Sequence, residues 1–272
     1  MLECVINLSE GRDERILAHL DAAAGPSLRD RHSDPVHHRS VFTLINGADA
    51  LLPDVHHLIN VALDILDLRD HDGVHPRLGV VDVVPFVALS PEVTATAMRL
   101  RDHTAQWVAR TRGVPAFLYG PLAGGERTLP YVRAHAFRTL APDYGPAAPD
   151  PRNGAVVVGA REILVAWNIW LSGVSLERAK LLAQLVRRPG VRTLGLPLGE
   201  HVQVSCNIVD YELAPPSQVY DQVVAHLPPG GRIDRCELVG LAPRRMLVRE
   251  DPARWSQLGL SDAATIESRL GR

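Results

Sequence analysis

The chain has 272 residues, of which 46% are hydrophobic and 22% are charged, and its formal net charge is −2. This composition is typical of a globular protein that builds a core without disulfides, and it excludes a disordered chain. The near-neutral charge provides no global field for nucleic acid or anionic lipid, so we expect the partner to be a small molecule or another protein.

Cysteine usage and hydropathy both indicate the cytoplasm. The three cysteines lack the CxxC spacing of a zinc site and are too few for a disulfide framework, which indicates a reducing compartment. No apolar run reaches the roughly 18 residues that a membrane-spanning helix needs, and residues 1–4 lack the charge pattern of a signal peptide. We therefore expect a cytoplasmic protein without a membrane partner.

Strand and helix signals in the first third of the chain follow the order βαββαβ. Strand patterns cover residues 2–7, 28–32, 40–45 and 80–89, and amphipathic helix patterns precede the second and the fourth of them. Pro53 fits the first turn of the second helix, where its missing N–H removes no hydrogen bond. A further helix, residues 90–113, and a strand, residues 114–119, follow.

The second half repeats this order without sequence identity to the first. Residues 141–154 are dense in proline and glycine, which no regular element tolerates, so they separate the two halves. After this segment, strands are predicted at residues 163–171, 191–196, 202–211 and 235–241, and helices at residues 176–188 and 217–227.

The order βαββαβ is that of a ferredoxin-like unit. We therefore predict an α/β (α+β) fold of two ferredoxin-like subdomains, with sheets facing each other and helices outside. The predicted boundaries are residues 1–150 for the N-terminal subdomain, 151–250 for the C-terminal subdomain and 251–272 for a helical tail.

Residues 68–79 concentrate ionisable side chains directly before an apolar strand. An imidazole titrates near neutral pH and can accept and return a proton, so His71 or His75 can act as a general base. Asp82 interrupts the apolar strand, and a buried carboxylate needs an arginine or histidine partner. We expect Asp82 to orient a catalytic group; the alternative is an outward position on a half-exposed strand.

Two arginines are candidates for binding an anion, and several histidines are candidates for binding a metal. Arg39 and Arg77 are candidates for holding carboxylates, because a guanidinium donates two parallel hydrogen bonds. A histidine metal site is the weaker reading, since Gly73 and Pro76 oppose the helix on which ligands four residues apart would meet. No glycine-rich phosphate loop is present, which argues against a nucleotide cofactor.

Several segments together carry a resemblance to a known family: residues 3–11, 38–43, 75–86, 117–120, 143–146 and 154–168. As a set they resemble the glutamate formiminotransferase family, the transferase half of formiminotransferase-cyclodeaminase, over residues 2 to about 247. The resemblance implies transfer of a formimino group from N-formimino-L-glutamate to tetrahydrofolate in histidine degradation. It also implies a folate tunnel between two subdomains, and a homodimer.

The resemblance also assigns roles to residues of this chain. His75 matches the family's catalytic base, with Asp82 and Arg77 beside it, and residues 145–154 match a folate-contacting loop. Tetrahydrofolate is the expected carrier, and no metal is expected. The expected substrate-binding residues are Asp30, His32, Arg39, Gly145, Pro146, Asn153, Gly154 and Asn168.

Two positions depart from the family pattern. His32 stands where the family usually has an aspartate, and Val74 stands where it has a glutamate. An alternative function is therefore a non-catalytic or divergent folate-binding protein that acts on another one-carbon folate, such as 5-formyltetrahydrofolate.

Overall fold

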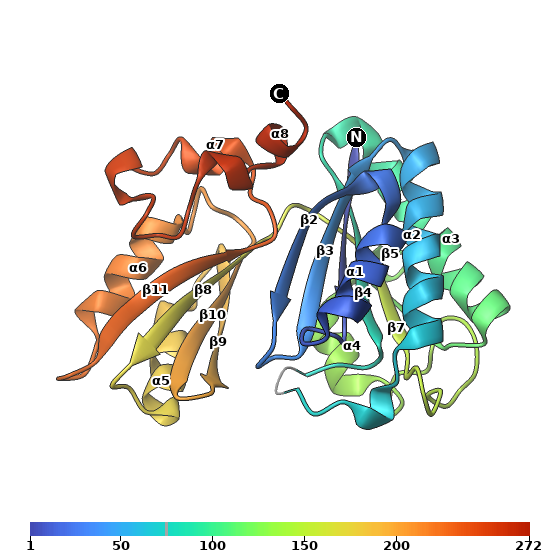
Figure 1. Ribbon diagram of the computed structural model, residues 1–272, viewed down its shortest axis with the longest axis horizontal. Coiled ribbons are helices and arrows are strands. Elements are labelled where there is room, and N and C mark those ends of the chain that lie inside the picture. The colour runs from blue at the N-terminus through green and yellow to red at the C-terminus, as the bar shows by residue number, and fades with distance from the viewer. Residues whose placement is uncertain (74–75) are drawn as a thin grey trace. The chain divides into compact units, whose positions relative to one another are not determined.

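Figure 1 shows the computed structural model of the chain, which describes residues 1–73 and 76–272. The chain forms two compact units, Met1–Ile163 and Leu164–Arg272, each with one sheet and its own helices. The predicted mixed α/β class with two subdomains is thus confirmed. The boundary at residue 150 stays a prediction.

The first unit is built on a sheet of seven strands in the order β2-β3-β1-β4-β7-β5-β6. The first four strands in the chain pair antiparallel, whereas β7 is parallel to both β4 and β5. The strands of this sheet are β1 (Leu2–Leu8), β2 (Leu28–Asp34), β3 (Arg39–Asn46), β4 (Val81–Ala88), β5 (Ala116–Leu122), β6 (Gly125–Arg127) and β7 (Val156–Arg161).

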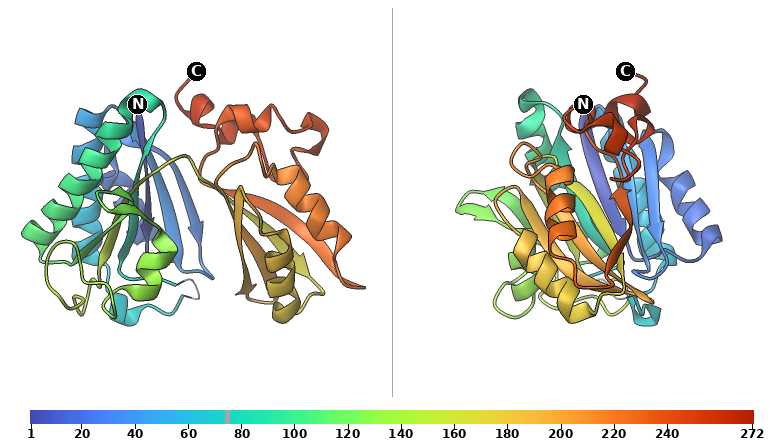
Figure 2. Two further views of the ribbon diagram at one scale, coloured as in Figure 1. Left: turned by 180° about the vertical axis from the view of Figure 1, so that it is seen from behind. Right: turned by 90° about the vertical axis from the view of Figure 1, so that its left-hand side faces the viewer.

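Three helices cover one face of this sheet, as Figures 1 and 2 show: α1 (Glu14–Ala23), α2 (Ala48–Ile65) and α3 (Thr94–Arg112). The sheet buries Cys4, Ile6 and Phe42 against the apolar stripes of these helices. The opposite face carries the shorter helix α4 (Leu129–His135), which packs over Val83 and Val157.

Because side chains alternate along a strand, Glu3, Val5 and Asn7 of β1 point away from the face that α1 to α3 cover. We call the face that carries these three side chains the open face of the first unit.

The second unit contains a four-stranded antiparallel sheet in the order β11-β8-β10-β9. Its elements are β8 (Val165–Ser172), α5 (Leu176–Val186), β9 (Val191–Leu198), β10 (His201–Ile208), α6 (Pro216–Ala225) and β11 (Arg232–Val239). The chain order βαββαβ with this strand order is the ferredoxin-like arrangement that the sequence predicts. In the first unit, β1 to β4 have the same arrangement, and β7, β5 and β6 extend it.

Three local predictions were wrong. Pro53 lies inside α2, because that helix begins at Ala48, where the Gly47 carbonyl accepts the N–H groups of Ala50 and Leu51. The chain forms the unpredicted strand β7 after the proline-rich segment, between β4 and β5. The closing helix expected over residues 255–270 does not form as one helix, because Gly259 adopts a left-handed φ of 63°.

The tail contains short 3₁₀ turns at Pro252–Arg254 and Asp262–Ala264 and the short helix α8 (Ile266–Arg269), and the short helix α7 (Arg244–Leu247) precedes the tail. Within the ranges that the structure describes, no helix combines the length and apolar content needed to cross a bilayer.

Candidate functional site

Asp82 is the fully buried centre of a charged cluster on the first unit. Its Oδ2 accepts hydrogen bonds from Arg39 Nη1 and Arg133 Nη2, each at 2.6 Å, and its Oδ1 accepts the Leu78 N–H at 2.8 Å. Burial alone would raise the pKa of Asp82, but the two guanidiniums and the N–H hold it below its ordinary value. Asp82 is therefore an ionised carboxylate, and its predicted arginine partner is present.

Arg39 and Arg133 reach this carboxylate from different elements. Arg39 begins β3, and its Nε donates to Asn7 Oδ1 at 3.3 Å. Arg133 lies on α4, and its Nη1 donates to the Pro76 carbonyl at 2.6 Å. Sequence reasoning missed Arg133, because α4 is too short to show a clear periodicity and no motif marks this position.

Arg77 adds a third guanidinium to the cluster. Its Nη2 donates to the carbonyls of Gly73 and His37, at 3.0 and 3.3 Å. Burial, together with the nearby charges of Arg39 and Arg133, lowers the pKa of Arg77 to about 10, while Asp82 opposes the shift. Since three guanidiniums share this region with the carboxylate of Asp82, the cluster is suited to bind anions.

His71 supports Gly73 and stacks on His38. Its Nδ1 accepts the Gly73 N–H at 3.1 Å, so we place the proton on Nε2, which donates to the His38 carbonyl at 2.7 Å. Arg77 Nη1 lies 2.8 Å from the same Nε2 and, since both groups are donors in this tautomer, makes no hydrogen bond with it. The two imidazoles stack with centroids 4.2 Å apart. These contacts give His71 a structural function beside Arg77.

His75, the predicted base, and Val74 lie outside the described residues. The described residues on either side bond to the cluster: Arg77 binds the Gly73 carbonyl and Arg133 binds the Pro76 carbonyl. The catalytic role of His75 stays a prediction.

The end of the predicted folate loop lies against the segment that precedes β4. The Asn153 carbonyl accepts the Val80 N–H at 3.0 Å, and the Leu78 carbonyl accepts the Ala155 N–H at 2.9 Å. Gly154 has a φ of +72°, and a Cβ there would collide with the Leu78 carbonyl, so this position requires glycine. The structure thus brings Asn153 and Gly154 next to residues 78–80.

The beginning of the same loop is placed differently. Gly145, with a φ of +88°, packs near Ala109 and Pro115 at the end of α3, and Pro146 is exposed. Pro115 also links the two ends of the loop, because its carbonyl accepts the Val156 N–H at 2.9 Å, two residues after Gly154.

Three further predicted site residues lie on strands. Asp30 and His32 are half-buried on β2, where they pair with Thr43 and Val41 of β3. Asn168 belongs to the second unit, on β8, and is 8% exposed. The roles predicted for these residues stay predictions.

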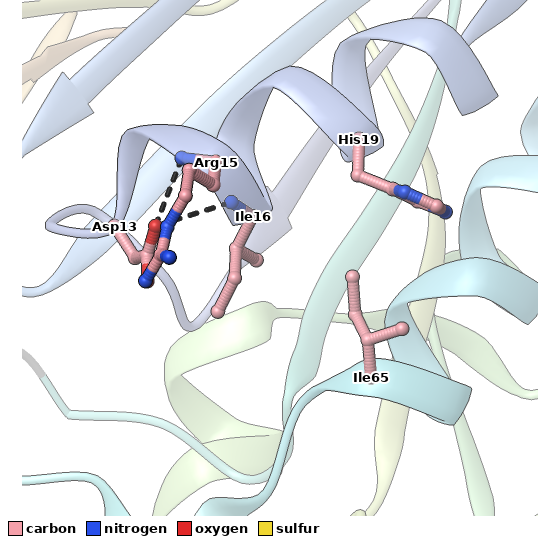
Figure 3. Close-up of a pocket in the computed structure, with 5 residues that line it drawn as sticks. All are labelled: Asp13, Arg15, Ile16, His19 and Ile65. Atoms are coloured by element: carbon pink, nitrogen blue, oxygen red, sulfur yellow. Dashed lines mark hydrogen bonds and ion pairs between the residues drawn. The ribbon is translucent and has the colours of Figure 1, made fainter.

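A surface pocket of about 350 Å³ lies between α1 and α2, away from these groups (Figure 3). Its polar side chains are Asp13, Arg15 and His19, of which Asp13 caps α1, since Oδ1 accepts the N–H groups of Arg15 and Ile16. This carboxylate already has a structural function, and no predicted site residue lines the pocket. For metal ions, no suitable group of three or more histidine, cysteine, aspartate or glutamate residues occurs in residues 1–73 and 76–272.

Comparisons with known proteins identify similar chains. The family profile described as the formiminotransferase domain, N-terminal subdomain, matches residues 1–161. The chain is 31% identical over 271 residues to glutamate formimidoyltransferase of Streptococcus pyogenes serotype M1, an alignment that covers 91% of each protein. It is 31% identical over 273 residues to glutamate formimidoyltransferase of Thermoplasma acidophilum, covering 91% of this chain and 90% of that protein.

The similarity extends to a longer protein. Formimidoyltransferase-cyclodeaminase of Sus scrofa is 31% identical over 281 residues, covering 91% of this chain and 51% of that protein. The chain thus spans about half the length of this relative.

Proposed function

The chain belongs to the glutamate formiminotransferase family and is a transferase; on this premise we propose that it transfers a formimino group from N-formimino-L-glutamate to tetrahydrofolate. The observation that carries this proposal is the grouping of Arg39, Arg77 and Arg133 around the buried Asp82. The two relatives named glutamate formimidoyltransferase align with this chain over about nine-tenths of their length, which supports the same reaction.

The arginine cluster suits the donor's two carboxylates. Asp82 neutralises part of the charge of Arg39 and Arg133, whereas Arg77 is held by backbone carbonyls. The remaining positive charge favours a dianion, and guanidinium–carboxylate pairs fix orientation as well as charge. In the proposal, these arginines hold the glutamate part so that its formimino carbon faces the folate.

His75 is the proposed proton carrier. The lone pair of folate N5 forms a bond to the formimino carbon while the C=N π electrons move to the imino nitrogen, and His75 takes the proton that N5 loses. When the C=N bond re-forms, the bond from carbon to the glutamate nitrogen breaks, and the imidazolium returns the proton to that nitrogen. One histidine thus serves both halves of the reaction.

Asp82 is proposed to act as a positioning residue. It fixes Arg39, Arg133 and the Leu78 N–H, and Arg133 also binds the Pro76 carbonyl. Because Pro76 directly follows His75, these bonds fix the chain immediately after the proposed base. We also propose that the protein forms a homodimer and that it acts in the cytoplasm, in histidine degradation.

The experiment that tests the reaction mixes the purified chain with tetrahydrofolate and N-formimino-L-glutamate and follows formimino-folate by its absorbance and by mass spectrometry. The proposal expects product with multiple turnovers. If folate binds but no product forms, the donor assignment is wrong. In that case the sequence departures at His32 and Val74 favour the second candidate, a protein acting on another one-carbon folate such as 5-formyltetrahydrofolate.

A further inference from the structure

Glu3 is a buried carboxyl that the proposed reaction does not use. It lies on β1 and is 4% exposed. Within the described residues its side chain makes no hydrogen bond and no ion pair. Buried polar side chains almost always have a partner, so an unpaired carboxyl in a central strand needs an explanation.

Strand register places Glu3 near two other polar groups. Glu3 pairs with Val87 of β4, and Val87 pairs with Arg161 of β7, so Glu3 and Arg161 flank Val87 on the open face. Tyr119 of β5 pairs with Gly159, two residues before Arg161. The Tyr119 ring occupies the space where a Cβ of Gly159 would lie, and the charge of Arg161 acts on its hydroxyl. Glu3, Tyr119 and Arg161 together are called the Glu3 cluster below.

The Glu3 cluster shares the open face with the arginine cluster. Asn7, which accepts a hydrogen bond from Arg39, lies four residues beyond Glu3 on the same strand, about 13 Å away at the rise of a β-strand. The apolar side chain of Val5 lies between them on this face. Along β1, the open face therefore carries the buried carboxyl of Glu3, then the apolar Val5 and then the arginine cluster.

We propose that Glu3 and Arg161 bind the pyrimidine edge of a pterin ring. The inference rests on the proposed function, because tetrahydrofolate carries such a ring. The 2-amino group and N3–H of a pterin are adjacent donors that match the two oxygens of one carboxylate, and the 4-oxo group is an acceptor that matches a guanidinium. Glu3 accepts the two donors, and Arg161 donates to the 4-oxo group. Tyr119 positions Arg161.

The ionisation of Glu3 gives this subsite a measurable signature. Burial raises the pKa of Glu3 to about 7, with Arg161 opposing the shift. The other titratable groups nearby are Cys4 on the same strand and Tyr119, whose pKa values burial raises, and Thr43 and Ile45 on β3 carry no charge. Because pterin donors favour the carboxylate form, binding releases a proton below pH 7, and affinity rises with pH through this range.

The test measures the Kd of 5-formyltetrahydrofolate for the full chain by calorimetry between pH 6 and 8, without the formimino donor. We expect Glu3→Gln to weaken binding roughly 10- to 100-fold at pH 8 and to remove the pH dependence, while affinity for N-formimino-L-glutamate stays unchanged. The control Glu126→Gln changes an exposed glutamate of β6 and leaves both affinities as they are.

A ligand series gives a second readout that needs no variant. An analogue with a methyl group in place of the 2-amino group binds the wild-type chain more weakly than 5-formyltetrahydrofolate, and Glu3→Gln abolishes this difference. If wild type and Glu3→Gln bind 5-formyltetrahydrofolate with equal affinity at pH 8, the proposed pterin subsite is wrong, whereas the proposed function is not contradicted. If the wild-type chain binds no folate, the proposed function itself fails, and this inference fails with it.

Discussion

Arg39 Nη1 donates to Asp82 Oδ2 across 2.6 Å, and this pair joins the start of β3 to the centre of the charged cluster. Asp82 is fully buried and the Arg39 side chain is 11% exposed, so water screens neither charge well. The pair therefore links the fold of the first unit to its site, because removal of the Asp82 charge leaves the Arg39 guanidinium buried without a counter-charge.

Replacing Asp82 by asparagine tests this link. The change leaves the guanidiniums of Arg39 and Arg133 without a counter-charge, and we expect a loss of about 3–5 kcal/mol in the free energy of unfolding, measured in urea. Asp72→Asn is the matched control, because Asp72 pairs with Arg12 at the surface with its side chain 74% exposed, and it should cost less than about 1 kcal/mol. Equal costs for the two variants would contradict the central position given to Asp82.

Arg133→Met tests donor binding. Without this guanidinium the cluster loses positive charge and the hydrogen bond to Pro76, so we expect the KM for N-formimino-L-glutamate to rise roughly tenfold or more. The Kd of 5-formyltetrahydrofolate should change much less. Arg138→Met, at an exposed arginine just beyond α4, is the control and should leave both values unchanged. An unaltered KM in Arg133→Met would remove Arg133 from the site.

The pH dependence of stability tests the buried Glu3. Its pKa is raised from 4.5 to about 7 in the folded chain, so the folded state binds the proton more tightly than the unfolded state. Stability therefore falls as pH rises from 4.5 to 7, by about 3 kcal/mol at most from a shift of about 2.5 units.

Glu3→Gln removes this titration. At pH 8 we expect the variant to unfold at higher urea concentration than the wild-type chain, and at pH 4.5 we expect similar midpoints. Unfolding curves of both proteins at the two pH values provide the measurement. A variant that is less stable than wild type at pH 8 would show that Glu3 has a stabilising partner.

Gly154→Ala tests the packing of the loop against residues 78–80. The φ of +72° and the collision with the Leu78 carbonyl should together cost more than about 2 kcal/mol of unfolding free energy. Gly199 has a φ of +62° with open space around its Cβ position, so Gly199→Ala should cost about 1 kcal/mol. The difference in unfolding free energy between the two variants measures the cost of the close approach of Gly154 to the Leu78 carbonyl. Equal losses of stability would contradict that contact.

Strand periodicity predicts much of this fold, because the alternation of side chains is visible within the sequence of each single strand. Residues 2–7 alternate and residues 40–45 are rich in β-prone side chains, and the structure extends each strand by one or two residues. The strand β7 escaped prediction because it follows a proline-rich segment and returns to a sheet formed earlier in the chain. No pattern within residues 156–161 themselves indicates that this segment joins the earlier sheet.

Arg39 and Arg77 were predictable as carboxylate-binding candidates from their guanidiniums, and Asp82 was predictable because its side chain conflicts with its surroundings. Asp82 stands out because it interrupts an apolar run, and the requirement for a partner follows from the cost of burying a charge. Arg133 and Arg161 gave no such signal, because arginine is common on surfaces and their positions depend on α4 and β7. Glu3 belongs to the same class, since its burial depends on the strands that pair with β1 on both sides.

The central claim is that His75 carries the proton, and the turnover of His75→Asn tests it most directly. The rate of formimino transfer is compared with that of wild type at saturating tetrahydrofolate and N-formimino-L-glutamate. If His75 carries the proton between folate and glutamate, turnover falls about 10²- to 10⁴-fold while the Kd of 5-formyltetrahydrofolate stays within a few-fold of wild type. A variant that keeps the wild-type turnover would contradict the assignment of His75 as the catalytic base.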